Sequence, residues 1–468
     1  PNTPLAYAHT MVDYVPLAME YGKLGGIDHT TTLIKAIRSE RGDDKVLLLD
    51  GGDTWQGSYT SLKTQGADMV EVMRALGTEA MVGHWEFTFG QDRLKELIDK
   101  LGYPFLGSNV FDTEWDEPVF ESTAFFEKGG VSIAVIGQHF PYTPIANPSY
   151  MVKGWSFGIR PEVLQKNVNK AKKQGAEIVV LLSHNGFDVD QKLASMIDGI
   201  DVILTGHTHD AIPKGIRIND TLLLSSGSHG KYLGRIDLKV KNGKVVDTSS
   251  NLIPVFSDVI PPDPDMTNLI NKIRAPYQEV CNRVIGKTET LLYRRGNFNG
   301  SWDDVICDTI MQERDTEISL SPGFRWGTTL LPGQKITIDD IYSQTSMNYP
   351  EVYRIEMTGK MIKEILEDVC DNIFNPDPFF QQGGDMVRVG GLTYTCHPKN
   401  KMGNRISNLR IISSDKPIES NKSYVVGGWG SVNQNVKGPP IYNLLENYIS
   451  EKKIIKSSNL EAVKIVGM

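Results

Sequence analysis

The stretch Leu47-Leu48-Leu49-Asp50-Gly51-Gly52-Asp53-Thr54-Trp55-Gln56-Gly57 decides the fold class of this chain. Its apolar start predicts a short buried strand at Val46–Leu49, and the paired glycines that follow allow a tight turn. Asp53 therefore stands just beyond the carboxyl end of a strand. In an open α/β sheet such ends share one edge, and ligands bind in the crevice there.

Three more segments place a metal-ligating residue type directly after an apolar strand. They are Val82-Gly83-His84-Trp85-Glu86-Phe87, Leu181-Leu182-Ser183-His184-Asn185-Gly186 and Leu204-Thr205-Gly206-His207-Thr208-His209-Asp210. Because the strand ends converge, the sequence predicts one metal site with the candidate ligands Asp53, His84, His184, His207 and His209. One carboxylate with several imidazoles suits Mn, Fe, Co or Zn better than Ca or Mg. A carboxylate shared by two ions is an arrangement that activates water.

The first 258 residues alternate strand and helix patterns, which predicts α/β layers around a buried sheet. Apolar runs predict strands at residues 133–136, 178–182 and 202–204, and helical periodicity appears at residues 31–38, 68–76, 92–101 and 161–174. Asn242-Gly243 predicts a hairpin turn. Prolines 261, 262 and 264 predict a domain boundary. We therefore expect a domain at 1–258, a Pro-rich linker with a helix at 259–284, and a mixed α and β domain at 285–468.

Composition narrows the class of protein further. The 468 residues are 40 % hydrophobic and 23 % charged, as in ordinary soluble domains. The net charge of −8 disfavours binding to nucleic acid. No apolar run approaches the ~20 residues of a membrane span. Four cysteines (Cys281, Cys307, Cys370 and Cys396) are too few and too scattered for a disulfide scaffold, and the sequence leaves their redox state open.

The remaining histidines lack the context of a strand end. We expect His9, His29 and His397 to have structural roles, while His139 and His229 stay open between a structural role and support of the ligands.

The order GGDTWQG, GHWEF, SHNG and GHTHD resembles the calcineurin-like metallophosphoesterases, and within them the 5′-nucleotidase family. That resemblance implies an N-terminal layered α/β metallophosphoesterase domain and a C-terminal α+β domain of the 5′-nucleotidase type. Where nucleotidases carry Asn-His, this chain has His84-Trp85. GHWEF, together with Ser321-Pro322-Gly323-Phe324-Arg325-Trp326-Gly327 and Gln381-Gln382-Gly383-Gly384-Asp385-Met386-Val387-Arg388, is similar to the SoxB-type thiosulfohydrolases.

This second resemblance implies a periplasmic hydrolase with two Mn²⁺ ions that acts in thiosulfate oxidation. Its substrate would be a cysteine-S-thiosulfonate on the C-terminal cysteine arm of a SoxYZ-like carrier protein, and its product sulfate. Trp85 fits this reading, because indole is a poor proton donor and a persulfide leaving group needs no acid. The alternatives are a 5′-nucleotidase-like phosphoesterase and a non-catalytic relative that binds the carrier.

The same family supplies two more ligands from an Asp-x-His sequence at the end of its first strand, and no such sequence occurs in residues 1–52. We therefore expect that the chain starts after that strand and that neighbouring strand edges are exposed. One ion would keep Asp53, His84, His184 and His207, whereas the other would keep only Asp53 and His209. This implies one bound metal at best and no activity for the segment alone.

On the substrate side, guanidinium groups match a tetrahedral oxyanion, so Arg325 and Arg388 are candidates to hold the sulfone oxygens. For both arginines the alternative is a salt bridge. Asn109 is a candidate to orient the substrate. Side chains that either line a channel for the carrier's arm or pack in the core are Trp85, Trp326, Trp429, Phe379 and Phe380.

Overall fold

A six-stranded sheet forms the centre of the N-terminal half in the computed structural model, which describes residues 14–294, 296–433, 436–457 and 462–467. Its strands, in spatial order, are β4 (Thr123–Lys128), β5 (Val131–Gln138), β7 (Ile178–Ser183), β8 (Val202–Thr205), β10 (Thr221–Ser225) and β9 (Ile216–Ile218). β5, β7, β8 and β10 run parallel, so their carboxyl ends meet at one edge. The three strand expectations in this region are confirmed.

Both faces of this sheet are buried, which explains why its strands are apolar runs rather than alternating ones. On one face Ile136, Leu181 and Ile203 pack against α7 (Pro161–Lys173) and α8 (Phe187–Met196). On the opposite face Val180 and Leu182 pack against a second layer of strands. Neighbouring residues such as Leu181 and Leu182 face opposite sides of the sheet because side chains in a strand repeat every two residues.

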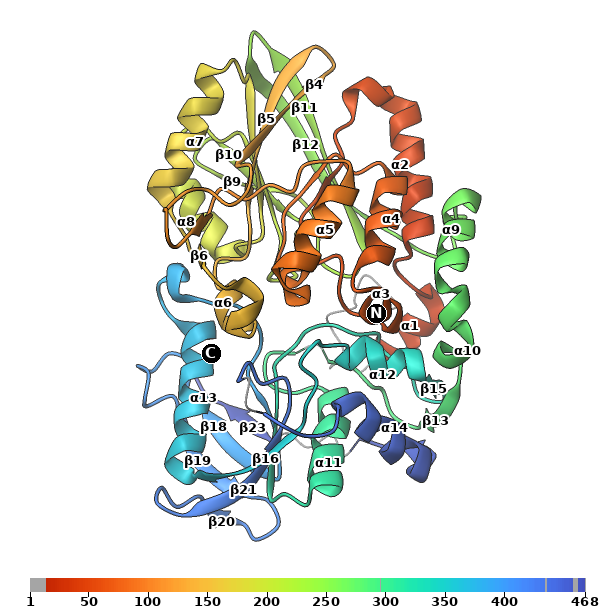
Figure 1. The fold of residues 1–468 in the computed structure, drawn as a ribbon, viewed down its shortest axis with the longest axis vertical. Coiled ribbons are helices and arrows are strands. Elements are labelled where there is room, and N and C mark those ends of the chain that lie inside the picture. The colour runs from red at the N-terminus through yellow and green to blue at the C-terminus, as the bar shows by residue number, and fades with distance from the viewer. Residues whose placement is uncertain (1–13, 295, 434–435, 458–461, 468) are drawn as a thin grey trace.

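The second layer consists of three pairs of strands. They are β1 (Leu49–Asp50) with β2 (Ala80–Met81), β3 (Val110–Asp112) with β6 (Trp155–Phe157), and the hairpin of β11 (Tyr232–Lys241) with β12 (Lys244–Pro254). The Asn242-Gly243 turn of this hairpin is confirmed. Helices α2 (Ile27–Arg41), α4 (Ala67–Leu76) and α5 (Gln91–Leu101) cover the layer from outside, so the half has α, β, β and α layers (Figure 1).

Strand β1 is shorter than the sequence predicts. We expected Val46–Leu49, but only Leu49 and Asp50 form a ladder, with Ala80 and Met81. Among the described residues no strand pairs with the other edge of β1, and β11 pairs with β12 alone. A cavity of about 1350 Å³ lies between these two edges and continues to the ligand cluster described below.

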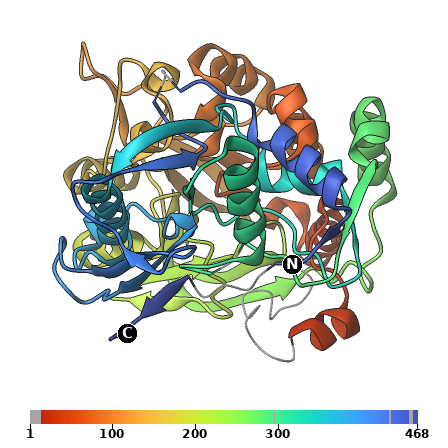
Figure 2. The same ribbon diagram turned by 90° about the horizontal axis from the view of Figure 1, so that it is seen from below.

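The linker helix is also interrupted. The sequence predicts one helix within the linker at 259–284, whereas the structure has α9 (Pro264–Arg274), a 3-10 turn at Ala275–Tyr277 and α10 (Gln278–Cys281). Pro276 cannot donate the backbone hydrogen bond that a continuous helix needs. Asp263 caps α9 and pairs with Lys35 of α2 at 2.5 Å, so the linker lies against the N-terminal half (Figure 2).

The C-terminal half mixes three small sheets with helices. The sheets are β15-β13-β22 (Lys335–Thr337, Val284–Thr288, Ile454–Ile455), β16-β21-β14-β17 (Tyr353–Thr358, Ser423–Gly428, Ile318–Ser321, Arg388–Gly390) and β20-β19-β18-β23 (Lys416–Pro417, Ile406–Ile411, Leu392–Cys396, Val463–Ile465). The helices are α11 (Ser301–Arg314), α12 (Ile338–Thr345), α13 (Gly359–Phe374) and α14 (Ile441–Lys452). The first described helix, α1 (Tyr14–Tyr21), packs against Leu331 of this half.

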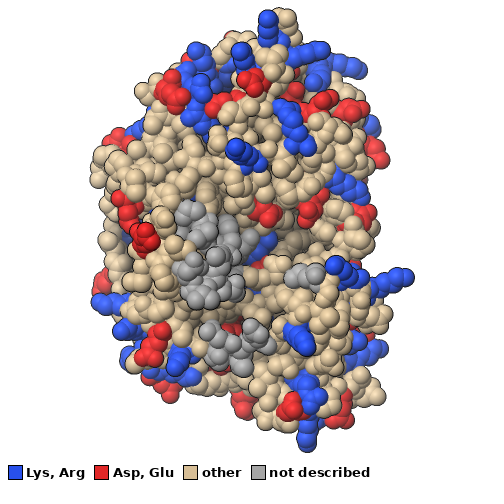
Figure 3. Space-filling model, turned by 180° about the vertical axis from the view of Figure 1, so that it is seen from behind, with Lys and Arg blue, Asp and Glu red and all other residues tan. Residues whose placement is uncertain are grey.

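Charged residues of both signs are spread over one face of the molecule. Lys and Arg are interspersed with Asp and Glu over the face shown in Figure 3. Within the described ranges no helix combines the length and the apolar character needed to cross a bilayer.

Strand β7, which ends immediately before His184, gives a test of the fold. Leu181 of β7 is fully buried, so Leu181→Ala leaves a cavity between the sheet and its helices, and we expect a loss of about 2–5 kcal/mol in the free energy of unfolding. Val246→Ala on the hairpin, where the side chain is 54 % exposed, is the matched control and should change it by under about 0.5 kcal/mol. Denaturant titration measures both, and equal losses would contradict the layer order.

Candidate metal centre

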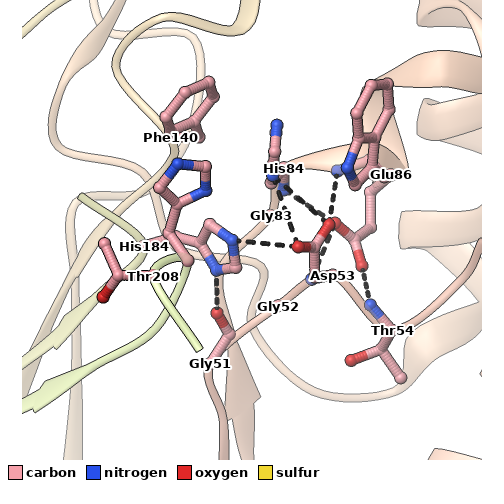
Figure 4. A network of polar contacts seen from close by, with 12 residues as sticks. Gly51, Gly52, Asp53, Thr54, Gly83, His84, Glu86, Phe140, His184 and Thr208 are labelled. Atoms are coloured by element: carbon pink, nitrogen blue, oxygen red, sulfur yellow. Dashed lines mark hydrogen bonds and ion pairs between the residues drawn. The ribbon is translucent and has the colours of Figure 1, made fainter. Parts of the chain in front are cut away.

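Asp53 forms the centre of the candidate site (Figure 4). Its Oδ1 lies 3.3 Å from Nδ1 of His84, and its Oδ2 lies 3.3 Å from Nε2 of His184. The three residues follow β1, β2 and β7, three elements far apart in the chain. The convergence of these strand ends brings them together, as expected of the carboxyl edge of an α/β sheet.

His207, after β8, completes a cluster of three imidazoles. One ligand nitrogen from each of His84, His184 and His207 lies within 4.8 Å of the others, and all three residues are buried. Nε2 of His84 and Nδ1 of His207 are buried and have no hydrogen-bond partner within the described part of the chain. Buried polar atoms are normally satisfied, so such orphaned nitrogens fit a metal ion.

His209 lies outside this cluster but lines the same cavity. Its ring faces that of His229, with the ring centroids 5.5 Å apart. The candidate ligands therefore fall into a close set of four, with Asp53, and one separate imidazole.

The backbone at the ligands is strained. Asp53, His207 and His209 have φ angles of 67°, 71° and 63°, in the left-handed region that residues other than glycine seldom adopt. Such conformations persist where the surroundings hold them and cluster at functional sites. Nothing in the sequence pattern signals this strain, because glycine is absent from these positions.

Glu86 joins two of the ligand loops. Its Oε1 accepts hydrogen bonds from the backbone N–H groups of Thr54 and Trp55, at 2.6 and 3.3 Å. Its Oε2 accepts from those of His84 and Asp53, at 2.7 and 3.2 Å. The carboxylate thus fixes the loop after β1 against the loop after β2. The motif at residues 82–87 contains Glu86, but the sequence alone does not indicate this role.

Electrostatics favour an ionised Asp53 and neutral rings of His84 and His207. Burial by itself raises the pKa of Asp53, but His84 and His184 hold that pKa well below its ordinary range. Burial by itself lowers the pKa of His184, but the contact with Asp53 raises that pKa above its ordinary value. Burial lowers the pKa of His84 and lowers the pKa of His207 further, so both rings are unprotonated near neutral pH. An imidazole binds a metal only in this form.

The residues therefore fit a divalent transition metal. Asp53, His84, His184 and His207 can supply a carboxylate oxygen and three imidazole nitrogens to one ion, a donor set typical of Mn, Fe, Co or Zn. A second ion beside the first would have Asp53 and His209 from the candidate ligands.

The C-terminal half covers the cluster. Arg325 donates from its two terminal nitrogens to the backbone carbonyls of His207 and Thr208, both at 2.9 Å. Nε2 of His207 lies 3.2 Å from the carbonyl oxygen of Gln382. The quoted motif contains Gln382 but does not indicate its contact with His207. Both contacts tie the loop after β8 to the second half of the chain.

An aromatic wall stands beside His84. The Trp85 ring packs edge-on against Phe324 and Trp326, with centroids 5.7 and 5.4 Å away. Trp85 and Trp326 both line the cavity. Trp326 also donates from Nε1 to the carbonyl of Gln344 at 2.7 Å. The cavity next to the ligands is thus apolar on this side.

Arg388 lies in a buried ion-pair network of the C-terminal half. Its guanidinium pairs with Asp303 at 3.2 Å and with Asp385 at 3.0 Å, and Arg294 pairs with Asp303 from the other side at 2.9 Å. Arg388 is absent from the described lining of the cavity. Of its two expected alternatives, this placement favours the salt bridge over contact with a substrate.

The other predicted substrate residues lie away from the described cavity lining. Asn109 is buried and exchanges hydrogen bonds with the backbone of His139, at 2.8 and 2.9 Å. Trp429 donates to Ser321 at 2.8 Å within the core. Phe379 packs against the core cluster around α8, and Phe380 is 63 % exposed.

The remaining histidines have identifiable contacts. His139 is buried among phenylalanines and accepts a hydrogen bond at Nδ1 from the N–H of Gly83, beside His84. His29 and His397 bond to Ile260 and Ser407, as expected for structural roles. His229 lies in an exposed turn that borders the cavity. His9 lies outside the described residues.

Comparisons with known proteins agree with this architecture. Residues 284–431 match the family model of the 5′-nucleotidase C-terminal domain. The sulfate thiohydrolase SoxB of Thermus thermophilus superposes with a TM-score of 0.95 at 36 % identity, covering 100 % of this chain and 88 % of that one. A 5′-nucleotidase precursor, also from Thermus thermophilus, has a TM-score of 0.83 at 20 % identity, over 95 % and 94 % of the two chains, and shows the fold alone. The 5′-nucleotidase of Diplobatis ommata is 23 % identical over 92 % of this chain and 83 % of its own.

Removal of Glu86 tests how the site is held. Glu86→Ala leaves four backbone N–H groups without their acceptor, so we expect metal affinity to fall about 10- to 100-fold. Glu96→Ala on α5, where the carboxylate pairs with Arg93 and Lys100 at the surface, is the matched control and should bind metal like the parent protein. Calorimetric titration with Mn²⁺ measures both, and unchanged affinity in Glu86→Ala would contradict the role given to Glu86.

Proposed function

The chain belongs to the SoxB sulfate thiohydrolase family, and on that premise we propose that it releases sulfate from a cysteine-S-thiosulfonate on a carrier protein during thiosulfate oxidation. In this reaction an oxygen of water bonds to the terminal sulfone sulfur. The sulfur–sulfur bond breaks, and its electron pair stays on the persulfide sulfur of the carrier's cysteine. Water thereby becomes part of the sulfate and loses its protons to the solvent.

The single observation that carries the proposal is Trp85 in its place beside His84. The indole lies against Phe324 and Trp326, with no ionisable group of its own to protonate a leaving group. An alkoxide leaving group of a nucleotide needs such an acid, whereas a persulfide is a better leaving group. The residue therefore favours sulfur–sulfur hydrolysis over phosphoester hydrolysis.

The metal ligands of the proposal are Asp53, His84, His184, His207 and His209. Metal ions held by them would supply Lewis acidity and a nucleophilic water at neutral pH. We infer Mn²⁺ from the family, and metal analysis of the purified protein tests that choice. Asp53, His84, His184 and His207 suffice for one ion, and we infer that a second ion, with Asp53 and His209, is held less firmly.

The arginines take different parts in the proposal. Both terminal nitrogens of Arg325 bond to carbonyls of the His207 loop, which supports a positioning role in addition to a place beside the sulfone. Arg388, neutralised by Asp303 and Asp385, supports the fold of the C-terminal half. Asn109 acts through the His139 segment, which it holds in place.

We propose that the cavity admits the C-terminal cysteine arm of a SoxYZ-like carrier in the periplasm. Trp85, Phe324 and Trp326 line the apolar side of the cavity and fit an extended peptide. Phe380, exposed near the boundary of the two halves, is a candidate contact outside it.

A 5′-nucleotidase-like activity is the second candidate, favoured by the match of residues 284–431 to the nucleotidase C-terminal domain. A non-catalytic carrier-binding protein is the third. Product analysis separates them.

The first test measures which product appears. The protein as its gene encodes it, loaded with Mn²⁺, receives a peptide bearing a cysteine-S-thiosulfonate and, separately, a nucleoside monophosphate. We expect sulfate and no phosphate, and chelation of the metal should abolish sulfate release. Phosphate alone would favour the nucleotidase, and neither product with metal bound would favour the binding protein.

The second test restores the missing acid. Trp85→His places an imidazole beside the metal ligands, so we expect phosphate release from the nucleotide to appear or to rise at least 10-fold, as general acid catalysis contributes about 10²–10⁴ in rate. Trp115→His, at a residue that is 72 % exposed, is the control and should leave both activities unchanged. No gain in phosphate release by Trp85→His would show that this position does not decide specificity.

A further inference from the structure

Two of the four cysteines touch in the core of the C-terminal half. Sγ of Cys370, on α13, lies 3.6 Å from Sγ of Cys396, at the end of β18. Both side chains are fully buried. The other two cysteines, Cys281 and Cys307, are also buried, in α10 and α11. The contact thus singles out one pair that the sequence spacing does not indicate.

The surroundings hold this pair in place. Glu367, one turn before Cys370 on α13, accepts hydrogen bonds from the backbone N–H groups of Gly403, Arg405 and Ile406 at 2.7, 3.1 and 2.8 Å. Ile406 is the cross-strand partner of Cys396. The helix and the strand pair therefore meet in a fixed register.

A second bond reinforces the same interface. The guanidinium of Arg405, itself buried, pairs at 2.5 Å with Asp371, the residue after Cys370. Helix α13 and the strand pair cannot separate at the two cysteines without breaking the contacts of Glu367 or Arg405. The approach of the two sulfurs is thus a consequence of how α13 docks on β18 and β19.

From this geometry we infer that Cys370 and Cys396 form a disulfide when the protein folds under oxidising conditions. A disulfide needs an S–S distance of about 2.05 Å, so the sulfurs have to close by roughly 1.5 Å, within the reach of side-chain rotation. The bond would close a loop over 26 residue positions and tie α13 to β18.

The chemistry requires a two-electron oxidant, and a small-molecule disulfide such as glutathione disulfide supplies it. The thiolate of Cys396 attacks one sulfur of the oxidant and releases one glutathione thiolate. The thiol of Cys370 loses its proton and attacks the sulfur of Cys396, which releases the second glutathione. Two cysteine thiols are oxidised, one glutathione disulfide is reduced to two thiols, and no atom is left over.

The two thiols differ in a way that suits this order. The hydrogen bond between the sulfurs lowers the pKa of Cys396 and raises the pKa of Cys370. Cys396 is therefore the thiol of the pair that loses its proton more readily and starts the exchange. Because both sulfurs are buried in the folded domain, a reductant reaches the finished bond only through unfolding or local opening.

Mass spectrometry tests the inference on the full chain. The protein is refolded from reductant and guanidinium chloride in a glutathione redox buffer, then unfolded with iodoacetamide and weighed. We expect adducts on two of the four cysteines, and a proteolytic fragment that links Cys370 to Cys396. A second sample, oxidised with glutathione disulfide at a guanidinium chloride concentration just below the unfolding transition, where local opening exposes the pair, should give the same count.

Single variants identify the pair. Cys370→Ser and Cys396→Ser should each carry three adducts, because each leaves three cysteines and no pair. Cys281→Ser and Cys307→Ser are matched controls and should each carry one adduct, because the pair survives. Reduction should lower the melting temperature of the parent protein by about 5 °C or more, and leave that of Cys370→Ser unchanged. Four adducts in both parent samples, or a link between other cysteines, would overturn the inference.

Discussion

The carboxylate of Glu86 is the interaction on which the site depends. It accepts hydrogen bonds from backbone N–H groups on both sides of the cluster, from the loop after β1 and from the loop after β2. These loops are separated by 31 to 33 positions in the chain, and their strands pair through only two residues each. The buried carboxylate therefore fixes the two loops relative to each other, which a two-residue ladder alone does not do. It thereby holds Asp53 against His84.

Much of the fold, and the grouping of the candidate ligands, followed from one pattern, an apolar run that ends in Asp or His. Asp53, His84, His184 and His207 meet because parallel strands end at a common edge, which is a property of topology and not of any single residue. The pattern did not indicate the role of Glu86, because a motif does not show from which backbone N–H groups the carboxylate accepts hydrogen bonds. Arg388 illustrates the converse: a guanidinium suited to an oxyanion is neutralised by Asp303 and Asp385, whose approach depends on tertiary packing.

The second half of the chain gives the cavity wall two chemically different sides. Phe324 and Trp326 meet Trp85 on one side, while Arg325 and Gln382 reach the loop of His207 on the other. One side thus presents aromatic rings, and on the other a guanidinium is bonded to the backbone carbonyls of the His207 loop. Family membership gives the architecture, and this asymmetry distinguishes the two sides of the cavity within it.

The bonds from Arg325 to the His207 and Thr208 carbonyls couple two equilibria. They exist only when the halves are in contact, and they hold the loop that presents one of the imidazoles. Any ion that prefers that loop geometry must therefore also prefer the docked arrangement of the halves. Thermodynamic reciprocity then makes docking strengthen ion binding by the same factor by which the ion strengthens docking. The metal centre is in this sense a reporter of the relative position of the two halves.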